Sequence, residues 1–578
     1  MTTEISRRLG RTDAAHDPVP ASGSRDRVTT ARVLTGRALA LVAVLAPLVW
    51  AASRSVCHQD LVNGGGLRQL GLLVESALRP SLAPDFLHTV ADAALVTVVF
   101  ATLGTLGALV IGAVGGLVLS DVTWPHRPPA TIRFLRAALR GVLVVVRSLH
   151  ELVWALLFVS VLGIDPVVAV LAIAVPFGAQ TAKVFADILD NSSRGPLLAL
   201  RHAGARPGPA LAYALLPGAA PLLISYSFYR FECALRSAVL LGVVGVGGLG
   251  QELTVSLQSR NWDEVWTLIA TVLVLSAAVD AWSSRVRADT AVAATSDRIS
   301  RSAGPAAGRR SPRSRWARWS LAVVVAGGLT SWWASGVSLE GLASSRTRRL
   351  TGSLLDDMWP PALPAGGWST LADGLLDTLA MAVLAMAVAV LLTVLLGPLA
   401  ARPVARSARA SRSSRAARVL GWVLARSVLL VLRSIPPTVW AILALLAFFP
   451  GVLPGAVALG LYTGGILGRL VAEAWENVDR RPRDALVAAG TPPRLASVAA
   501  LVPPSTHHLV TYTLYRFEIC VRDTAVVGVV GAAGLGRLLS DGLVSFNFAV
   551  VSSVLLASVM VSLGSEVLGR AVRSATRV

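Results

Sequence analysis

Two blocks of the sequence place a glutamate four residues before an arginine inside long apolar runs. Glu232 precedes Arg236, and Glu518 precedes Arg522. On a helix this spacing puts both side chains on one face, and glutamate before arginine favours an ion pair. Ionisable residues inside a membrane span are costly and therefore indicate a functional site. We expect both pairs to lie along a pathway through the membrane.

Further arginines in apolar runs extend this expectation. Arg147 has Glu151 four residues on, whereas Arg433 is followed by Pro436 and Pro437 without a carboxylate at that distance. An arginine without a local acid attracts anions, and its guanidinium suits bidentate binding of phosphoryl oxygens. We hypothesise that Arg433, and with it Arg147, faces the pathway and helps to pass an oxyanion. The alternative is that a carboxylate on another helix neutralises each arginine. The predicted pathway residues are Arg147, His150, Glu151, Arg433, Arg230, Glu232, Arg236, Arg516, Glu518 and Arg522.

The composition indicates an integral membrane protein. Of 578 residues, 54% are hydrophobic and 15% are charged, with a mean hydropathy of +0.64, whereas soluble domains carry about 25% charged residues. The net charge of +20 comes from arginines in short polar segments between apolar runs, as the positive-inside rule requires. A nucleic-acid partner would need them on one polar surface, so we expect contact with lipid and none with nucleic acid. Three cysteines form no disulfide framework or zinc motif, and we assign no metal.

The elements that carry these residues are predicted to be about twelve transmembrane helices. Each needs about 20 apolar residues. The arginine-rich loops place both termini in the cytoplasm of a multi-pass protein of the cell membrane, although an arginine cluster at 346–349 lies in a loop assigned to the outer side. The predicted spans lie near 36–54, 92–119, 138–162, 166–189, 213–243, 263–284, 317–336, 373–400, 419–449, 452–476, 499–529 and 546–569.

The chain contains an internal repeat. The stretch "YRFECALRSAVLLGVVGVGGLG" at 229–250 aligns without gaps with "YRFEICVRDTAVVGVVGAAGLG" at 515–536, with twelve of 22 positions identical. Six spans in each half give both halves the same orientation, so the repeat is parallel and the pathway lies at the repeat interface. We divide the chain into a disordered cytoplasmic tail (1–35), a first half (36–286), a cytoplasmic linker (287–316) and a second half (317–578).

The glycines that end each repeated block fit a dinucleotide fingerprint only once. "GVGGLG" at 245–250 matches G-x-G-x-x-G, but Ala533 replaces the second glycine in the other copy. A pyrophosphate turn needs that glycine and a surrounding βαβ unit, so we reject this function. We expect the glycines to form two matched hinges of an outer gate. They are Gly245, Gly248, Gly250, Gly531, Gly534 and Gly536.

The repeated blocks resemble the permease subunit of phosphonate-type ATP-binding-cassette (ABC) importers. The resemblance rests on "RS-(I)P--VWA", "YRFE---R" and "GVVG-(G)GLG", and covers nearly all of both halves. It implies an all-α fold of two six-helix repeats of the ABC type I importer permease kind, as two permeases fused head to tail. The "YRFE" block distinguishes this resemblance from methionine-type permeases, which share the glycine-rich end.

The resemblance also implies two loops that dock ATPase subunits. The family pattern is Glu-Ala-Ala, three further residues, Gly, nine residues, Ile, one residue and Leu-Pro. The acidic position is Asp484 in one half and is absent in the other, which puts the docking contacts in doubt. We expect the glycine to end a short helix and the proline to start the next membrane helix. The matching residues are Ala199, Gly204 and Pro217 in the first half, and Asp484, Ala485, Gly490 and Pro503 in the second.

The sequence contains a single lysine, and the residue before it shows that the chain has no P-loop of its own. Lys183 follows Ala182, not the glycine that phosphate binding requires. We therefore expect no enzyme, no catalytic residues and no cofactor in this chain. The resemblance implies that two partner ATPase subunits bind ATP and Mg²⁺, and that an extracellular or periplasmic binding protein delivers a phosphonate or a related phosphorus oxyanion such as phosphate or phosphite. The alternatives are an ABC permease for another solute, such as methionine, and a secondary transporter.

Overall fold

The computed structural model describes residues 45–55, 61–124, 128–302, 315–334, 336–337, 340–401 and 412–575. The chain forms two units, Met1–Trp50 and Ala51–Val578, and every element below belongs to the second. The predicted tail (1–35) lies outside the described residues, as do residues 36–44 of the first predicted span (36–54). The predicted linker is described as helix up to residue 302 and again from residue 315.

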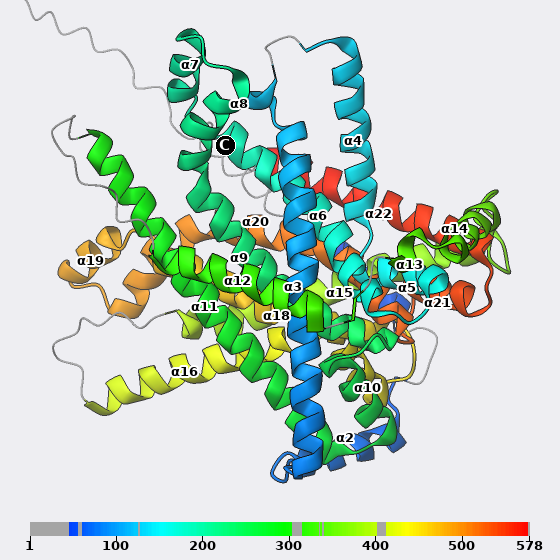
Figure 1. Cartoon of the computed structure of the whole chain (residues 1–578). Coiled ribbons are helices and arrows are strands. Elements are labelled where there is room, and N and C mark those ends of the chain that lie inside the picture. The colour runs from blue at the N-terminus through cyan, green and yellow to red at the C-terminus, as the bar shows by residue number, and fades with distance from the viewer. Residues whose placement is uncertain are drawn as a thin grey trace, which may run out of the picture. The chain divides into compact units, whose positions relative to one another are not determined.

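The first half is a succession of helices (Figure 1). They are α2 (Gly64–Ser76), α3 (Pro84–Leu119), α4 (Ala130–Ser148), α5 (Glu151–Leu162), α6 (Pro166–Asp190), α7 (Gly195–His202), α8 (Pro207–Ala210), a π turn (Leu211–Leu215), α9 (Leu216–Leu241), α10 (Leu249–Ser259) and α11 (Trp262–Ser302).

The second half repeats this order from α15 onward. Its helices are α12 (Arg315–Ala334), α13 (Glu340–Ala343), α14 (Ser345–Asp357), α15 (Trp368–Ala400), α16 (Arg412–Ser434), α17 (Pro437–Ala447), α18 (Val452–Asn477), α19 (Arg481–Ala488), α20 (Pro493–Val529), α21 (Leu535–Val544) and α22 (Phe548–Ala575). Thus α3 corresponds to α15, α6 to α18, α7 to α19 and α11 to α22. The predicted all-helical duplication is confirmed.

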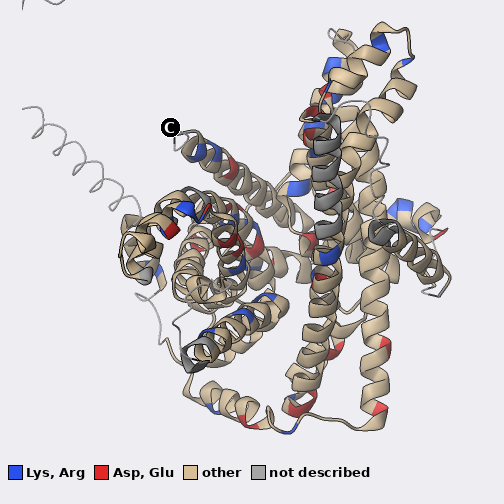
Figure 2. Ribbon diagram, turned by 90° about the vertical axis from the view of Figure 1, so that its left-hand side faces the viewer, with Lys and Arg blue, Asp and Glu red and all other residues tan. Residues whose placement is uncertain are grey.

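Long stretches of these helices carry no charged residue (Figure 2). Among the described residues, seven helices are long and apolar enough to cross a membrane, and up to nine if each of two bent pairs counts as one span. Of the other predicted spans, one falls on α12, whose apolar part is only Ala322–Trp333, and one on α20. The arginine cluster at 346–349 lies on the separate helix α14.

Two predicted spans are bent, not straight. The helices α4 and α5 meet at 95°, and α16 and α17 meet at 93°. Pro436 and Pro437 lie at the break of the second pair, because proline cannot continue the helical hydrogen bonds. The first pair breaks without proline: His150 is the N-cap of α5, and its Nδ1 accepts a hydrogen bond from the Leu152 N–H at 3.2 Å.

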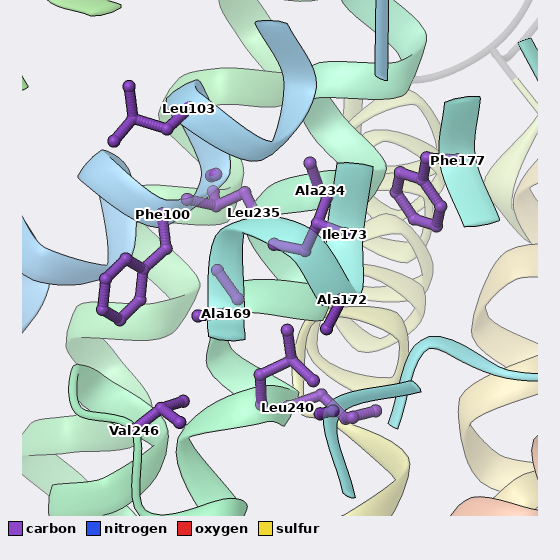
Figure 3. Packing of buried hydrophobic residues seen from close by; sticks show 14 of the residues in the cluster. Phe100, Leu103, Ala169, Ala172, Ile173, Phe177, Ala234, Leu235, Leu240 and Val246 are labelled. Carbon is purple, nitrogen blue, oxygen red and sulfur yellow. The ribbon is translucent and has the colours of Figure 1, made fainter. Parts of the chain in front are cut away.

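The core of the first half lies between α3, α6 and α9. Phe100 and Leu103 of α3 pack with Ile173 of α6 and Leu235 of α9 (Figure 3). Small residues let α3 and α6 approach closely, since a Cβ on Gly112 would lie 2.4 Å from the Thr181 side chain. Close packing over small residues is how membrane helices associate without a hydrophobic driving force between them.

Candidate functional site

A cavity of about 330 Å³ lies between the two halves. Its walls come from α5, α6 and α9 of the first half, and from the α16–α17 bend, α18 and α20 of the second. This is the interface at which a parallel repeat places its pathway. The ionisable lining residues are Arg230, Arg236, Arg433, Arg469, Arg516, Arg522, His150, Glu151, Glu232, Glu473 and Asp523, with tyrosines beside them.

The structure brings eight of the ten predicted pathway residues to this cavity. Arg147 and Glu518 do not line it. The eight that do are His150, Glu151, Arg433, Arg230, Glu232, Arg236, Arg516 and Arg522.

The two ion pairs expected from helical spacing form. Arg236 Nη2 lies 2.8 Å from Glu232 Oε1 on α9, and Arg522 Nη2 lies 3.5 Å from Glu518 Oε1 on α20. Arg522 Nη1 also donates to the Arg147 carbonyl oxygen at 2.8 Å, across the two halves. These arginines are therefore held by carboxylates of their own helices.

Arg433 is not left without an acid, which corrects the expectation drawn from Pro436 and Pro437. Its Nη1 lies 3.3 Å from Glu232 Oε1 and its Nη2 lies 3.1 Å from Asp280 Oδ2. Both carboxylates belong to the first half, on α9 and α11. The structure therefore supports the alternative interpretation, in which carboxylates on other helices neutralise Arg433.

Arg147 also pairs with the opposite half and not with Glu151. Its Nη2 donates to both carboxylate oxygens of Glu566 on α22 at 2.8 Å, and Lys183 Nζ lies 3.8 Å from Glu566 Oε1. Glu151 instead accepts a 2.6 Å hydrogen bond from the Ser237 hydroxyl.

These contacts form two matched inter-half ion clusters. One joins Arg147, Lys183 and Glu566, and the other joins Arg433, Arg469 and Asp280, with Arg469 Nη1 2.7 Å from Asp280 Oδ1. Each member of the first cluster has its counterpart in the second at the same repeat offset. In each cluster the central carboxylate comes from one half and the arginine of the bend from the other.

Arg230 and Arg516, one from each "YRFE" block, differ from the other cavity arginines. Arg230 donates from Nε to the Tyr226 hydroxyl at 2.8 Å and from Nη2 to Gln180 Oε1. Arg516 Nη2 lies 3.4 Å from Thr463 Oγ1 and 4.0 Å from Asp523 Oδ2. Both side chains are buried, although polar partners and not close carboxylates hold them.

Sequence reasoning missed several charged residues of the site. Arg469 and Glu473 on α18 form an i,i+4 pair at 2.7 Å, and the four-residue spacing noted for Arg147 and Glu151 would also have found them. Asp523 Oδ1 lies 3.6 Å from His150 Nε2. No local pattern indicates that contact, because α20 and the α4–α5 bend are far apart in the chain. Within the described ranges, no three His, Cys, Asp or Glu side chains converge to hold a metal ion.

The predicted docking loops are short helices, α7 and α19, that end as expected. Gly204 and Gly490 follow them with φ of +86° and +90°, the left-handed geometry that glycine supplies at helix ends. Pro207 and Pro493 start the helices that follow. Pro217 lies in the first turn of α9, as predicted, whereas Pro503 lies inside α20 and does not start it. In the first half a π turn at Leu211–Leu215 precedes Pro217, where the missing proline N–H leaves a carbonyl without its helical partner.

The glycine-rich ends of the repeated blocks form matched turns. Gly248 and Gly534 have φ of +80° and +87°. The next N–H in each half, of Leu249 or Leu535, donates at 2.9 Å to a threonine hydroxyl, of Thr97 or Thr378 respectively. The described residues around both turns are helical. A function as gate or hinge stays a proposal.

The fold and the site together define a membrane permease built from two copies of one domain. The model of the family "Binding-protein-dependent transport system inner membrane component" matches residues 131–290 and again residues 412–577. The chain belongs to this family, and the predicted fusion of two permease copies is confirmed.

Two curated relatives support the resemblance seen in the sequence. The phosphate-import permease protein PhnE of Mycolicibacterium smegmatis is 29% identical over 452 residues, which cover 78% of this chain and 79% of the relative. The phosphite transport system permease protein PtxC of Stutzerimonas stutzeri is 34% identical over 38% of this chain and 72% of its own length.

Proposed function

We propose that the chain is the translocation subunit of an ABC importer for phosphonates or related phosphorus oxyanions such as phosphate and phosphite. The single observation that carries this proposal is the arginine-lined cavity between the two repeats. Guanidinium groups bind phosphoryl oxygens bidentately, and a site between parallel repeats is open to each side in turn when the halves rock. The names of the two relatives, for phosphate and for phosphite, agree with this class of solute.

The proposal requires partner subunits. Two ATPase subunits would dock on α7 and α19, bind ATP and Mg²⁺ and drive alternating access, so that the chain itself is not an enzyme and holds no cofactor. A binding protein would deliver the anion at the opposite membrane face. The arginine-rich segments around α7 and α19 support a cytoplasmic position for both helices and for both termini.

Reconstitution tests this function. The chain, with ATPase subunits and a binding protein, is placed in liposomes, and ATP hydrolysis and solute uptake are measured. Binding protein loaded with methylphosphonate, phosphate or phosphite should raise hydrolysis and drive uptake. If methionine-loaded binding protein stimulated hydrolysis instead, the chain would be a permease for another solute. Uptake driven by an ion gradient without ATP would make it a secondary transporter.

The docking helix α7 offers a separate prediction. Leu197 is buried and anchors the helix, whereas Leu198 on the same helix is 43% exposed. Exposed leucine on a short helix suits an apolar contact with a partner. Leu198→Asp should therefore reduce co-purification of the ATPase subunits by about tenfold, the effect of losing roughly 1.4 kcal/mol. Leu355→Asp on α14, at a leucine that is 59% exposed, is the matched control and should leave co-purification intact. Equal retention by both variants would argue against docking at α7.

A further inference from the structure

We propose that Arg230 and Arg516 together form the oxyanion-binding site inside the cavity between the halves. This proposal rests on the proposed function and deepens it, because it assigns the anion to two of the six cavity arginines. Both residues lie in the matched "YRFE" blocks, both line the cavity, and each comes from a different half.

The other four cavity arginines are already engaged by carboxylates. A paired guanidinium offers little attraction to a further anion, since its charge is balanced and its donors are occupied. Each of the four has a carboxylate oxygen within 3.5 Å: Arg236 has Glu232, Arg522 has Glu518, Arg433 has Glu232 and Asp280, and Arg469 has Asp280 and Glu473.

Arg230 is positioned without being neutralised. The Tyr226 hydroxyl and the Gln180 amide oxygen accept its hydrogen bonds, and its guanidinium carbon lies 4.7 Å from the centre of the Phe177 ring. Neutral acceptors and an aromatic face orient the guanidinium and leave its positive charge for a ligand.

Arg516 is held more loosely still. The position that matches Gln180 in the second half is Ile466, which cannot accept a hydrogen bond. The Arg516 side chain is 8% exposed, and among the described residues the Arg516 Nε has no hydrogen-bond partner. A buried donor of a charged group without a partner is unfavourable. An oxyanion bound against Nε would satisfy it.

Asp523 is the one described carboxylate within ion-pair distance of Arg516, at the outer limit of 4.0 Å. It also faces His150 Nε2 at 3.6 Å. The matching residue in the first half is Ser237, which carries no charge. Asp523 therefore competes with an incoming anion for Arg516, and its removal should strengthen binding, a result that a misfolded variant would not produce.

The test measures binding of radiolabelled inorganic phosphate to the full chain alone, in lipid nanodiscs. Arg230→Gln and Arg516→Gln should each weaken binding at least about tenfold, as expected for loss of a charge-assisted contact. Asp523→Asn should tighten it about threefold. Arg140→Gln, at an exposed arginine of α4 outside the cavity, is the control and should bind like the wild type.

Two results would overturn the proposal. One is wild-type affinity in both arginine variants, and the other is no saturable binding of millimolar phosphate by the wild-type chain. If Arg516→Gln fails to fold, the Asp523→Asn variant tests the proposal. Unchanged phosphate affinity in that variant would contradict the competition of Asp523 with the anion for Arg516. Since no ATPase or binding protein is present, this measurement is independent of import. Uptake that persists in the complex with both arginines replaced would reject the site and leave the import function standing.

Discussion

At the scale of single residues, the role of each cavity arginine follows from the atoms within reach of its guanidinium. Arg433 has a carboxylate on each side, Glu232 and Asp280, and all three side chains are largely buried. Buried charges are tolerated when they are paired, and removing one partner leaves the others uncompensated. We therefore assign Arg433 to the contact between the halves and Arg230 and Arg516 to the anion.

The first prediction concerns Arg433. Arg433→Gln should lower the free energy of unfolding by about 1 to 3 kcal/mol, because Glu232 and Asp280 each lose a buried counter-charge. The loss stays moderate because Arg236 and Arg469 remain against these carboxylates. Thermal unfolding in detergent measures the change, with Arg140→Gln as the control. Equal melting temperatures of the two variants would show that these contacts add no stability.

At the scale of elements, the glycine turns fix how each "YRFE" helix meets the next helix. The backbones of α9 and α10 approach so closely that a Cβ on Gly250 would lie 1.7 Å from the Val239 carbonyl oxygen. The matching contact, between Gly536 and the Ala525 carbonyl oxygen, would be 2.5 Å. Because the obstructing atoms belong to the backbone, no side-chain rotation relieves the overlap. The glycines are thus required by packing.

The second prediction follows from this contact. Gly250→Ala should destabilise the chain by about 3 kcal/mol or more, since the turn must open to admit the methyl group. The matched control is Gly218→Ala in α9, where a Cβ would meet nothing within 4 Å and helix propensity should improve. Expression level and melting temperature report both variants. A Gly250→Ala chain as stable as the control would contradict the close approach.

At the scale of the whole molecule, the two inter-half ion clusters connect the first half to the second. Each cluster places a carboxylate of the last long helix of one half, α11 or α22, against the arginine at the bend of the other half. A change in the angle between the halves must lengthen these contacts. They would therefore resist the rocking of the two halves that the proposed import mechanism requires.

The third prediction measures this connection with a double-mutant cycle of Arg147→Ala and Glu566→Ala. The coupling energy for unfolding should be about 1 to 3 kcal/mol, as for buried charges in direct contact. The comparison cycle uses Arg136 and Asp121, which pair at 2.6 Å within one half although the Asp121 side chain is 69% exposed. That pair should couple by less than about 1 kcal/mol. Equal coupling in the two cycles would remove the special role of the inter-half pair.

Much of the architecture could be predicted because it is encoded locally. The repeat is visible as twelve identities in 22 positions, and helix spacing predicts the Glu232–Arg236 and Glu518–Arg522 pairs. Local patterns did not predict the bend at His150, which lacks a proline, or the π turn before Pro217. Both depend on how neighbouring helices pack, and the hydrophobic periodicity of a single helix carries no information about that packing.

The sequence by itself determined the membrane class, the duplication, the family and eight of the ionisable residues that line the cavity, since hydropathy, spacing and motifs act over a few turns of one helix. Only the tertiary structure decided which arginines are neutralised. Arg433 meets Glu232 across 201 positions and Arg147 meets Glu566 across 419. Such partners are chosen by helix packing between the halves, because a Coulomb interaction depends on distance in space and not on separation along the chain.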